Sequence, residues 1–326
     1  MSQLISLLQA AITFGTVIMF GALGEVVTEK SGNLNLGTPG IMYLGGIAAL
    51  AGAFFYESGV ENPNALVGIL IALVCCVVAS ALGGLIYAFL TVTLRANQNV
   101  TGLTLTIFGS GVANFFGGSM NKLAGGVGQI SVATTSGGFR ATLPLAKLGT
   151  VGAILFNHGF LVYTAIVLAV VLHLLLGRTR VGLNLRAVGE SPATADATGI
   201  NVTRYKYTAT CVGSVITGLG GMFYVMDYIK GTWANDGAIE SLGWLALALV
   251  IFAAWKPLNT IWGAYLFGIL YWLYYYIGGL TRYSQELFKM LPYVVTIVVL
   301  VITSMRKKQE NLGPAALGQN YFREER

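Results

Sequence analysis

Long stretches without a charged side chain constrain this chain more than any other feature. Only 10% of its 326 residues are Asp, Glu, Lys or Arg, whereas soluble domains usually carry about 25%. A membrane-spanning helix needs about 20 predominantly apolar residues to cross a hydrocarbon core of about 30 Å. The charge-free stretches are residues 1–24, 31–56, 62–94, 96–121, 148–177, 207–226, 241–255, 257–281 and 290–305. They predict an all-α polytopic membrane protein with about nine transmembrane helices, the seventh starting a few residues before 241.

The domain organisation that we expect is simple: a single membrane domain, residues 1–305, followed by a short polar cytoplasmic tail, residues 306–326. The first apolar stretch lacks the positive region of a signal peptide, so we treat it as a mature helix. Residues 118–149, rich in Gly, Ser and Thr, are too polar to span, and they form either an external loop or a re-entrant segment. The three cysteines all lie in apolar stretches, which favours small buried side chains over a disulfide or a metal site.

Lysine and arginine placement predicts the orientation, because these residues are enriched on the cytoplasmic side. With the N-terminus outside and the C-terminus inside, 13 of the 19 lysines and arginines are cytoplasmic. The six that would face outward are Lys122, Arg140, Lys147, Lys230, Arg282 and Lys289. The run "YWLYYY" (residues 271–276) fits an aromatic belt at the outer interface better than a surface for stacking on a nucleobase, which stays an alternative.

Several kinds of chemistry are missing from the sequence. No G-x-x-x-x-G-K-[ST] phosphate loop is present, so the chain does not bind ATP in the usual way. His158 and His173 have no second ligand at metal-binding spacing, and no nucleophile and base pair indicates an enzyme. The predicted spans carry essentially no charge of the kind that couples transport to ions. We expect Glu25 and Asp227 to lie at helix ends, in the interface rather than in a functional site.

One polar segment, "LRAVGESPATADATGI" (185–200), interrupts the apolar pattern within cytoplasmic residues 178–204. It predicts a short helix with Ser191 as N-cap, Pro192 at the first position and Gly199 in the left-handed conformation that ends it. Ala193 and Ala197 would form its small apolar face. Two turns are too short to be stable alone. The helix therefore rests either on its own membrane domain, as an ordinary loop, or on a cytoplasmic motor.

Four stretches resemble the permease subunits of bacterial ABC importers, in the branch that transports branched-chain amino acids, simple sugars and nucleosides. They are "LRAVGESPATADATGINV", "TEKSGNLNLGTPGIMYLGG", "LRANQNVTGLTLTIF" and "GWLALALVIFAAWKPLNTIWGAYLFG". Together they extend from about residue 25 to 270. Within this branch the chain is most similar to the shorter permease of nucleoside importers fed by basic-membrane-protein-type lipoproteins.

The resemblance implies a subunit of the bacterial plasma membrane with three partners: an ABC ATPase, a sister permease and an external substrate-binding lipoprotein. The sister permease makes a heterodimer, although a homodimer is possible. No cofactor is expected in this chain, since ATP and Mg²⁺ are bound by the partner ATPase. The residues that the resemblance assigns to coupling with the ATPase are Arg186, Gly189, Glu190, Pro192, Ala193, Asp196 and Gly199.

Polar residues near two predicted helix starts are candidates for a substrate pathway. They are Asn33, Asn35, Thr38, Asn97, Gln98, Asn99 and Thr101. Turn and capping chemistry explains the same residues about as well. The chain also departs from the family pattern, because Pro39 replaces an acid, "ESLG" (240–243) lacks an Arg, and Trp255-Lys256-Pro257 replaces W-N-P.

The function expected is ATP-driven import of a small polar solute. A nucleoside is the favoured substrate, and a simple sugar or a branched-chain amino acid is the alternative. An ion-coupled secondary transporter is the alternative from another class.

Overall fold

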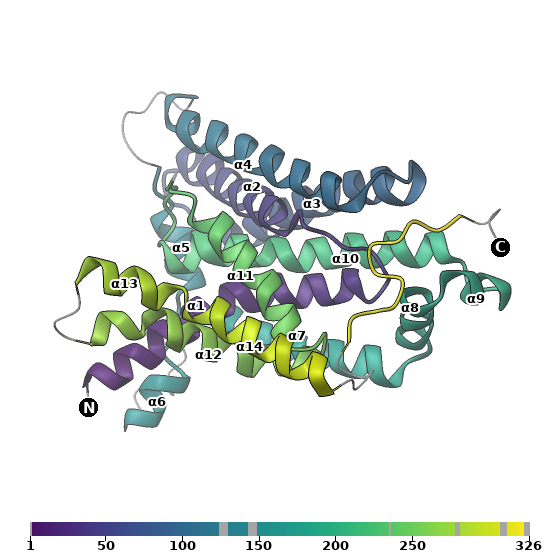
Figure 1. The fold of residues 1–326 in the computed structure, drawn as a ribbon. Coiled ribbons are helices and arrows are strands. Elements are labelled where there is room, and N and C mark those ends of the chain that lie inside the picture. The colour runs from purple at the N-terminus through teal and green to yellow at the C-terminus, as the bar shows by residue number, and fades with distance from the viewer. Residues whose placement is uncertain are drawn as a thin grey trace.

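The computed structural model consists of helices joined by loops, without a strand, in the residues that it describes, which are 2–123, 130–142, 149–234, 236–277, 281–306 and 312–322 (Figure 1). The predicted all-α class is confirmed. The elements are α1 (Ser2–Glu29), α2 (Thr38–Gly59), α3 (Ala65–Ala88), η1 (Phe89–Thr93), α4 (Gln98–Leu123), α5 (Ala133–Phe139), α6 (Gly149–Leu155), α7 (Phe160–Arg178), α8 (Arg180–Glu190), α9 (Pro192–Ala197), α10 (Val202–Phe223), η3 (Tyr224–Tyr228), α11 (Ala238–Phe252), α12 (Pro257–Tyr276), α13 (Arg282–Lys289) and α14 (Leu291–Arg306).

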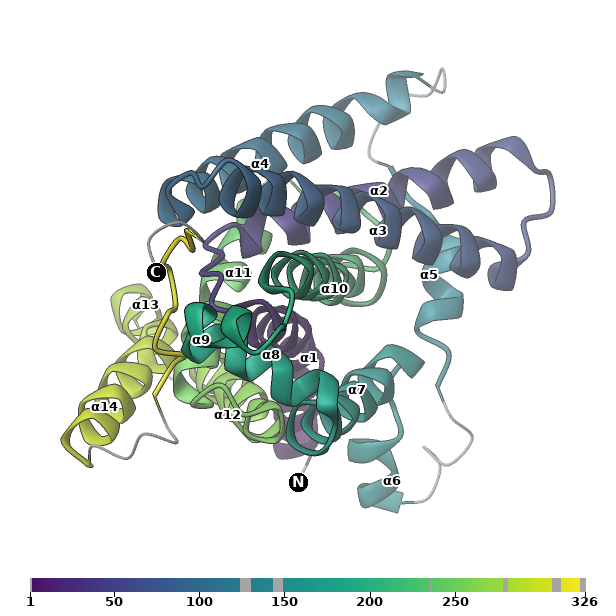
Figure 2. The ribbon, with the colours of Figure 1, turned by 90° about the vertical axis from the view of Figure 1, so that its right-hand side faces the viewer.

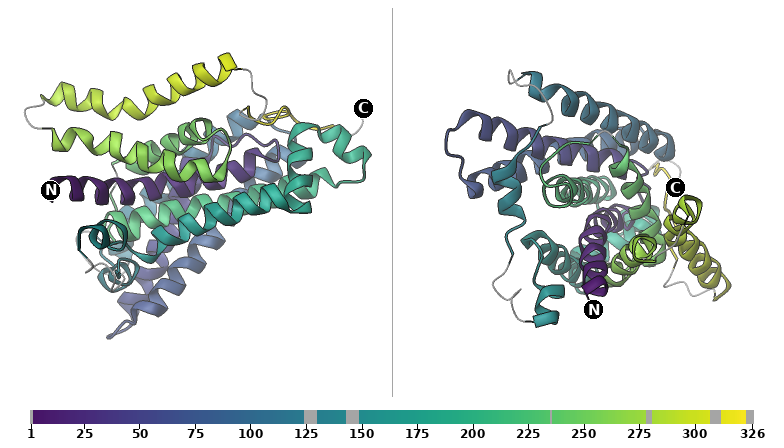
Figure 3. Two further views of the ribbon diagram at one scale, coloured as in Figure 1. Left: turned by 90° about the horizontal axis from the view of Figure 1, so that it is seen from below. Right: turned by 90° about the vertical axis from the view of Figure 1, so that its left-hand side faces the viewer.

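Helices α1 and α10 lie side by side at the centre of the bundle (Figure 2). Helices α2, α3 and α4 cover one side, α7 and α12 pack on the other, and α11 contacts α1 and α2. Helices α13 and α14 lie at the periphery (Figure 3). Helices α8 and α9 project at the end of the molecule opposite the N-terminus of α1 (Figure 1). The bundle thus has two distinct ends, joined by its long helices.

Glycine allows the central helices to approach at backbone distance. A Cβ added to Gly221 of α10 would lie 1.8 Å from the carbonyl oxygen of Met42 in α2, and one added to Gly45 would lie 2.6 Å from the oxygen of Gly218. Small residues permit such contacts in membrane bundles, where packing rather than water drives helix association. These glycines therefore let α2 and α10 pack closely at their crossing.

The outer helices expose apolar side chains. Leu70, Val74 and Leu82 of α3, with Ile107 and Phe115 of α4, are all more than half exposed. Large apolar surfaces of this kind face lipid or another subunit in a membrane protein. A polytopic membrane protein is therefore supported by both sequence and structure.

The number of crossings differs from the expectation of nine. Six segments of the described chain are long and apolar enough to span: Gln3–Glu29, Thr38–Gly59, Ala65–Thr93, Gln98–Met120, Phe160–Arg178 and Val202–Tyr228. A seventh is added if the pair Tyr283–Lys289 and Leu291–Ile302, bent by 41°, counts as one span. Helix α11 has only 15 residues, and α12 is rich in Tyr and Trp. Length and composition thus do not support nine, which stays a prediction.

The prediction of one continuous span over residues 148–177 is wrong. The described part of this stretch contains α6 and α7, separated at residues 156–159. The His158 ring bonds to the carbonyl oxygen of Ile154 at 2.9 Å, and Gly159 starts α7 in an extended conformation. A Cβ on Gly159 would lie 2.2 Å from the Phe139 carbonyl oxygen. The chain breaks here because the glycine packs against backbone from another segment.

The polar segment 118–149 contains a short, partly buried helix, α5, that packs against α3 and η3. The Glu57 carboxylate accepts the backbone N–H of Thr135 at 2.6 Å, and the Ser136 hydroxyl donates to the Met226 carbonyl at 2.8 Å. This part of the segment is folded against the bundle. Its residues 124–129 and 143–148, the latter including Lys147, lie outside the described residues.

Candidate functional site

The local structure predicted for residues 191–199 is confirmed. The Ser191 hydroxyl accepts the Thr194 N–H, Pro192 occupies the first turn of α9, and Gly199 has a φ of +88°. Before it, α8 starts with the Thr179 hydroxyl accepting the Gly182 N–H at 3.1 Å. These two capped helices form the projecting end of the molecule.

The predicted apolar face of α9, Ala193 and Ala197, is exposed and is not the face that packs on this chain. Ala195, only 3% exposed, is the residue that packs on the chain, in a cluster with Val188 and Val202. Ala193 and Ala197 are exposed. The helix has two turns only, so the residue facing the chain is set by how α8 and α10 enter and leave it. The exposed alanines leave an apolar tip with no partner among the described residues of this chain.

The C-terminal tail folds back onto these helices through its described part, residues 312–322. The Ala316 N–H donates to the Gly189 carbonyl oxygen at 3.0 Å, and the Ala315 N–H donates to the Glu190 carboxylate at 3.2 Å. The Tyr321 hydroxyl donates to the Asp196 carboxylate at 2.7 Å. Three of the predicted coupling residues therefore contact the tail. Residues 307–311 and 323–326 lie outside the described part of the chain.

Arg186 and Glu190 line a groove of about 440 Å³. Lys30, Trp255 and Lys256 line it as well. Burial lowers the pKa of the Lys30 ammonium, and the nearby Glu190 carboxylate acts in the opposite direction. The groove therefore combines charges of both signs next to α8. All of the predicted coupling residues lie at this end of the molecule: Arg186, Gly189, Glu190, Pro192, Ala193, Asp196 and Gly199.

The first group of predicted pathway residues forms a buried turn. Asn33, Asn35 and Thr38 are each at most 1% exposed. The Asn33 amide donates to the Thr210 hydroxyl at 3.0 Å, and the Thr38 hydroxyl donates to the Glu25 carboxylate at 2.9 Å. Turn chemistry is present as well, because the Asn35 side-chain oxygen accepts the Gly37 N–H at 2.9 Å, whereas Thr210 and Glu25 belong to other helices. A role in the pathway stays a prediction.

The second group lies at the start of α4, at the cytoplasmic end by the predicted orientation. Asn97 caps the helix by accepting the Val100 N–H at 3.1 Å, and the Thr101 hydroxyl donates to the Asn97 carbonyl at 2.8 Å. The buried Gln98 accepts the Leu34 N–H at 2.7 Å, which ties the two groups together. Asn99 is exposed. The structure thus joins the groups through Gln98 but brings Asn97 and Asn99 to the surface.

Glu25 and Asp227 lie near helix ends, as expected, but the expectation of charge-free spans is wrong, because the long apolar helices carry charged residues. Glu25 and Glu29 are 1% and 4% exposed, within α1, and the Trp255 indole donates to the Glu29 carboxylate. Lys206 is 3% exposed in α10. An oxygen of Asp227 in η3 is buried without a hydrogen-bond partner among the described residues. The turn at residues 30–38 covers Glu25 and the tail covers Lys206, and neither covering is visible from the hydropathy of α1 or α10.

Two departures from the family pattern are neighbours in space. A Cβ on Gly243 would lie 2.6 Å from the Cα atom of Pro39. Pro39 is buried in the first turn of α2, and Gly243 is buried in α11. An apolar backbone contact therefore stands where the resemblance expects polar groups.

A pocket of about 380 Å³, half of whose ten lining residues are aromatic, lies between α1, η3, α11, α12 and α14. The rings of Phe14 and Tyr271 stack with centroids 4.2 Å apart, and those of Tyr224 and Tyr228 with centroids 5.3 Å apart. Such faces suit a flat, partly apolar solute. The other lining residues are Asp236, Ala238, Ser241, Leu242, Leu245 and Tyr293.

Of the lining residues, the sequence connected only Tyr271 with a substrate, as an alternative in which residues 271–276 stack on a nucleobase. The favoured interpretation made Tyr271 part of an interfacial belt, whereas the structure places this ring, half-buried, in the pocket wall. The spacing of Tyr224 and Tyr228, four residues apart on one helical face, was the available signal. Among the described residues, no group of three or more His, Cys, Asp or Glu side chains is placed to hold a metal ion.

Comparison with known proteins decides the family. Residues 7–300 match the family described as "Branched-chain amino acid transport system / permease component". The chain belongs to this family of ABC transporter permeases. The permease is 32% identical to the putative glucose ABC transporter permease protein TsgC13 of Haloferax volcanii, over 99% of both chains. It is 31% identical to the nucleoside ABC transporter permease protein NupC of Lactococcus lactis subsp. cremoris, over 96% of this chain and 95% of the relative.

A third relative, the guanosine ABC transporter permease protein NupQ of Bacillus subtilis, is 29% identical over 91% of this permease and 92% of its own length. No solved structure matches the permease. The predicted resemblance to ABC permeases, with nucleoside permeases among the relatives, is confirmed.

Proposed function

We propose that this permease is a membrane-spanning subunit of an ATP-driven importer and that it translocates a nucleoside delivered by an external binding lipoprotein. A nucleobase is flat and aromatic, and its ribose carries hydroxyls. The pocket offers stacked rings together with the side chains of Asp236 and Ser241. This pocket is the observation that carries the substrate class, and the names of NupC and NupQ support it.

The projecting end of the molecule, α8 and α9, supports coupling to a partner ATPase as the energy source. The tip of α9 exposes Ala193 and Ala197, while its other face packs on α8 and bonds to the tail through Asp196 and Tyr321. A partner ATPase that grips this tip moves α8 and thereby the adjoining ends of α7 and α10. ATP and Mg²⁺ belong to that ATPase, and the exposed faces of α3 and α4 suit contact with a sister permease or with lipid.

A nine-crossing topology, with the N-terminus outside and the C-terminus in the cytoplasm, completes the proposal. It places the tyrosine-lined pocket toward the external half and α8 and α9 in the cytoplasm. Cysteines introduced singly at exposed positions in the 60–63 loop and in α9 test it by labelling with an impermeant thiol reagent.

The decisive experiment co-expresses the permease with the genes next to its own and measures uptake of radiolabelled guanosine into vesicles. We expect uptake that needs ATP, is stopped by vanadate and survives a protonophore, together with an ATPase and a second permease that co-purify in mild detergent. Uptake that collapses with the protonophore and needs no ATPase would show a secondary transporter instead.

The second candidate substrate is a simple sugar, because the relative TsgC13 is named for glucose. Aromatic rings flanked by Asp and Ser also suit a sugar with one apolar face and several hydroxyls. Competition decides between them: excess unlabelled glucose leaves guanosine uptake unchanged if the nucleoside is the substrate. Excess leucine tests the branched-chain amino acid in the same assay.

A further inference from the structure

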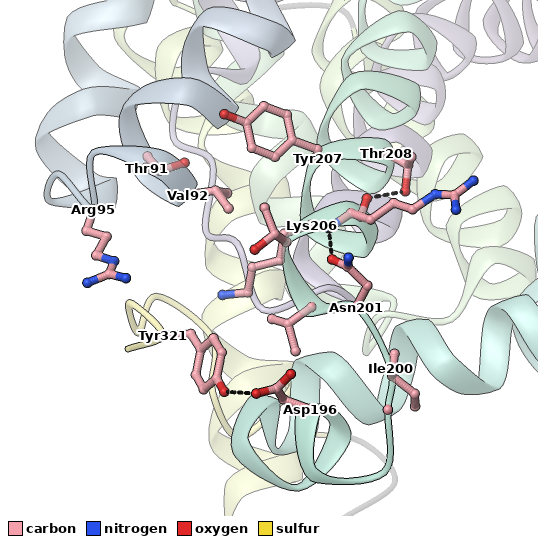
Figure 4. Close-up of a pocket in the computed structure, with 14 residues that line it drawn as sticks. Thr91, Val92, Arg95, Asp196, Ile200, Asn201, Lys206, Tyr207, Thr208 and Tyr321 are labelled. Carbon is pink, nitrogen blue, oxygen red and sulfur yellow. Dashed lines mark hydrogen bonds between the residues drawn. The ribbon is translucent and has the colours of Figure 1, made fainter. Parts of the chain in front are cut away.

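A cavity of about 670 Å³ opens at the same end of the molecule as α8 and α9. Its walls come from the end of η1, the start of α10, the turn after α9 and the tail, as Figure 4 shows. Arg95 and Lys206 approach it from different walls, and Tyr321 lies beside Asp196 on a third (Figure 4). The cavity therefore joins four segments that are far apart in the sequence.

Positive charge dominates the lining. Arg95, Arg204 and Lys206 line the cavity, and Asp196 is its one carboxylate. That carboxylate already accepts the Tyr321 hydroxyl at 2.7 Å. Within the described ranges, the salt bridge is between Lys289 and Glu286, away from the cavity. No carboxylate of the described residues therefore lies within salt-bridge distance of these three cations.

The burial of Lys206 makes the excess positive charge energetically unfavourable. Its side chain is 3% exposed, and its ammonium donates to the carbonyl oxygen of Gln319 at 3.4 Å. A buried ammonium without an anionic partner is strongly destabilised. Arg95 is exposed, and its guanidinium lies 4.6 Å from the centroid of the Phe322 ring. Since no carboxylate among the described residues pairs with these two cations, an anion seated between Arg95 and Lys206 would balance their charge.

The position of the cavity indicates the source of that anion. The span Ala65–Thr93 ends at one wall and the span Val202–Tyr228 begins at another. Apolar side chains continue from both walls toward the bilayer: Phe89 lies one turn before Val92, and Val212 lies one turn after Thr208. Phe89 is 49% exposed and Val212 51% exposed. Charge at the membrane boundary with exposed apolar surface beside it matches the two parts of a phospholipid.

We propose that this cavity binds a phosphate group and that the group is the headgroup of an anionic phospholipid in the cytoplasmic leaflet. The guanidinium of Arg95 offers a fork of donors to two phosphate oxygens, and the Lys206 ammonium acts as a point charge. The bound lipid ties the start of α10 to the end of η1, next to α9. This inference does not depend on which solute the permease carries.

Native mass spectrometry of the full chain in mild detergent tests the proposal. The chain is titrated separately with phosphatidylglycerol, with phosphatidylcholine and with inorganic phosphate. Each cation near a lipid surface contributes about fivefold to affinity, so R95Q/K206Q binds phosphatidylglycerol about thirtyfold more weakly than wild type. The control R178Q/R180Q also removes two positive charges, but from exposed arginines that do not line the cavity, and it stays within about twofold of wild type.

The single variant R95Q keeps the test valid if the double variant fails to fold, because Arg95 is exposed, and it should bind about fivefold more weakly. Equal affinity of wild type and R95Q/K206Q for phosphatidylglycerol overturns the proposal. Equal affinity of wild type for phosphatidylglycerol and phosphatidylcholine overturns it as well. Phosphate binding that the double variant loses, without preference for the anionic lipid, overturns the lipid as the source and assigns the cavity to free phosphate.

Discussion

The crossing of α2 and α10 is the contact whose perturbation can be worked out most directly. Replacing Gly221 with Ala puts a Cβ 1.8 Å from the Met42 carbonyl oxygen, and real Cβ contacts are essentially never under 3.0 Å. The two backbones must therefore separate by at least 1.2 Å, the difference between these distances. No side chain can rotate away, because the obstacle is backbone. Overpacking of this kind costs about 1–3 kcal/mol, and we expect the upper end of that range.

The assay uses the permease's own cysteines. Cys76 is fully buried and Cys75 and Cys211 are half-buried, so a thiol-reactive dye reports unfolding in detergent. We expect the melting temperature of Gly221→Ala to fall by about 4 °C, because an unfolding entropy of roughly 2.1 cal/mol/K per residue gives about 1.5 °C per kcal/mol in a chain of 326 residues.

The matched control for this prediction is Gly111→Ala. Gly111 also lies inside a helix, but an added Cβ meets nothing within 4 Å. This variant should melt at or slightly above the wild-type temperature, because Ala favours a helix over Gly by about 1 kcal/mol. Equal melting of Gly221→Ala and Gly111→Ala would refute the argument that this crossing depends on backbone contact.

Three further predictions concern the two ends of the bundle. In Gly189→Ala, the new Cβ lies 2.4 Å from the Lys30 carbonyl oxygen and displaces α8. We expect ATPase activity of the assembled complex to persist in proteoliposomes while uptake falls at least about tenfold. Normal uptake would contradict the coupling role. Tyr271→Ala removes the ring stacked on Phe14 and should raise the half-saturating solute concentration by about 2- to 12-fold, whereas Tyr271→Phe should stay within about twofold; equal effects of the two variants would exclude stacking. Tyr321→Phe deletes the hydrogen bond to Asp196 and should speed amide hydrogen exchange in residues 312–322 by about tenfold, and unchanged exchange would show that the tail is held without it.

Local features of this chain could be predicted from its sequence because they depend on neighbouring residues. The cap by Ser191, the proline that follows it and the left-handed Gly199 are all within one short segment. The apolar stretches gave the long helices for the same reason. The break before α7 was missed, since Gly159 is required by the backbone of Phe139, which lies in another part of the chain.

The site could be predicted only in part, because its residues meet through tertiary structure. Glu25 is buried by the turn that contains Asn35 and Thr38, not by anything in α1. The aromatic pocket combines five elements, from Phe14 near the start to Tyr293 near the end of the chain. Hydropathy alone treats each of these residues as an ordinary member of its own helix.

The position of the tail has a consequence for biosynthesis. Ribosomes release the N-terminal end first, and regions of a chain fold as they emerge. Yet the Gly32 and Gly189 carbonyl oxygens accept N–H groups from Gly318 and Ala316, and Gln98 bonds to Gln319 and Asn320. The end of the permease proposed to meet the ATPase therefore reaches its final packing only after almost the whole chain has been translated. A prematurely terminated chain would insert its long helices but leave these groups unpaired, so only finished subunits would be ready for assembly.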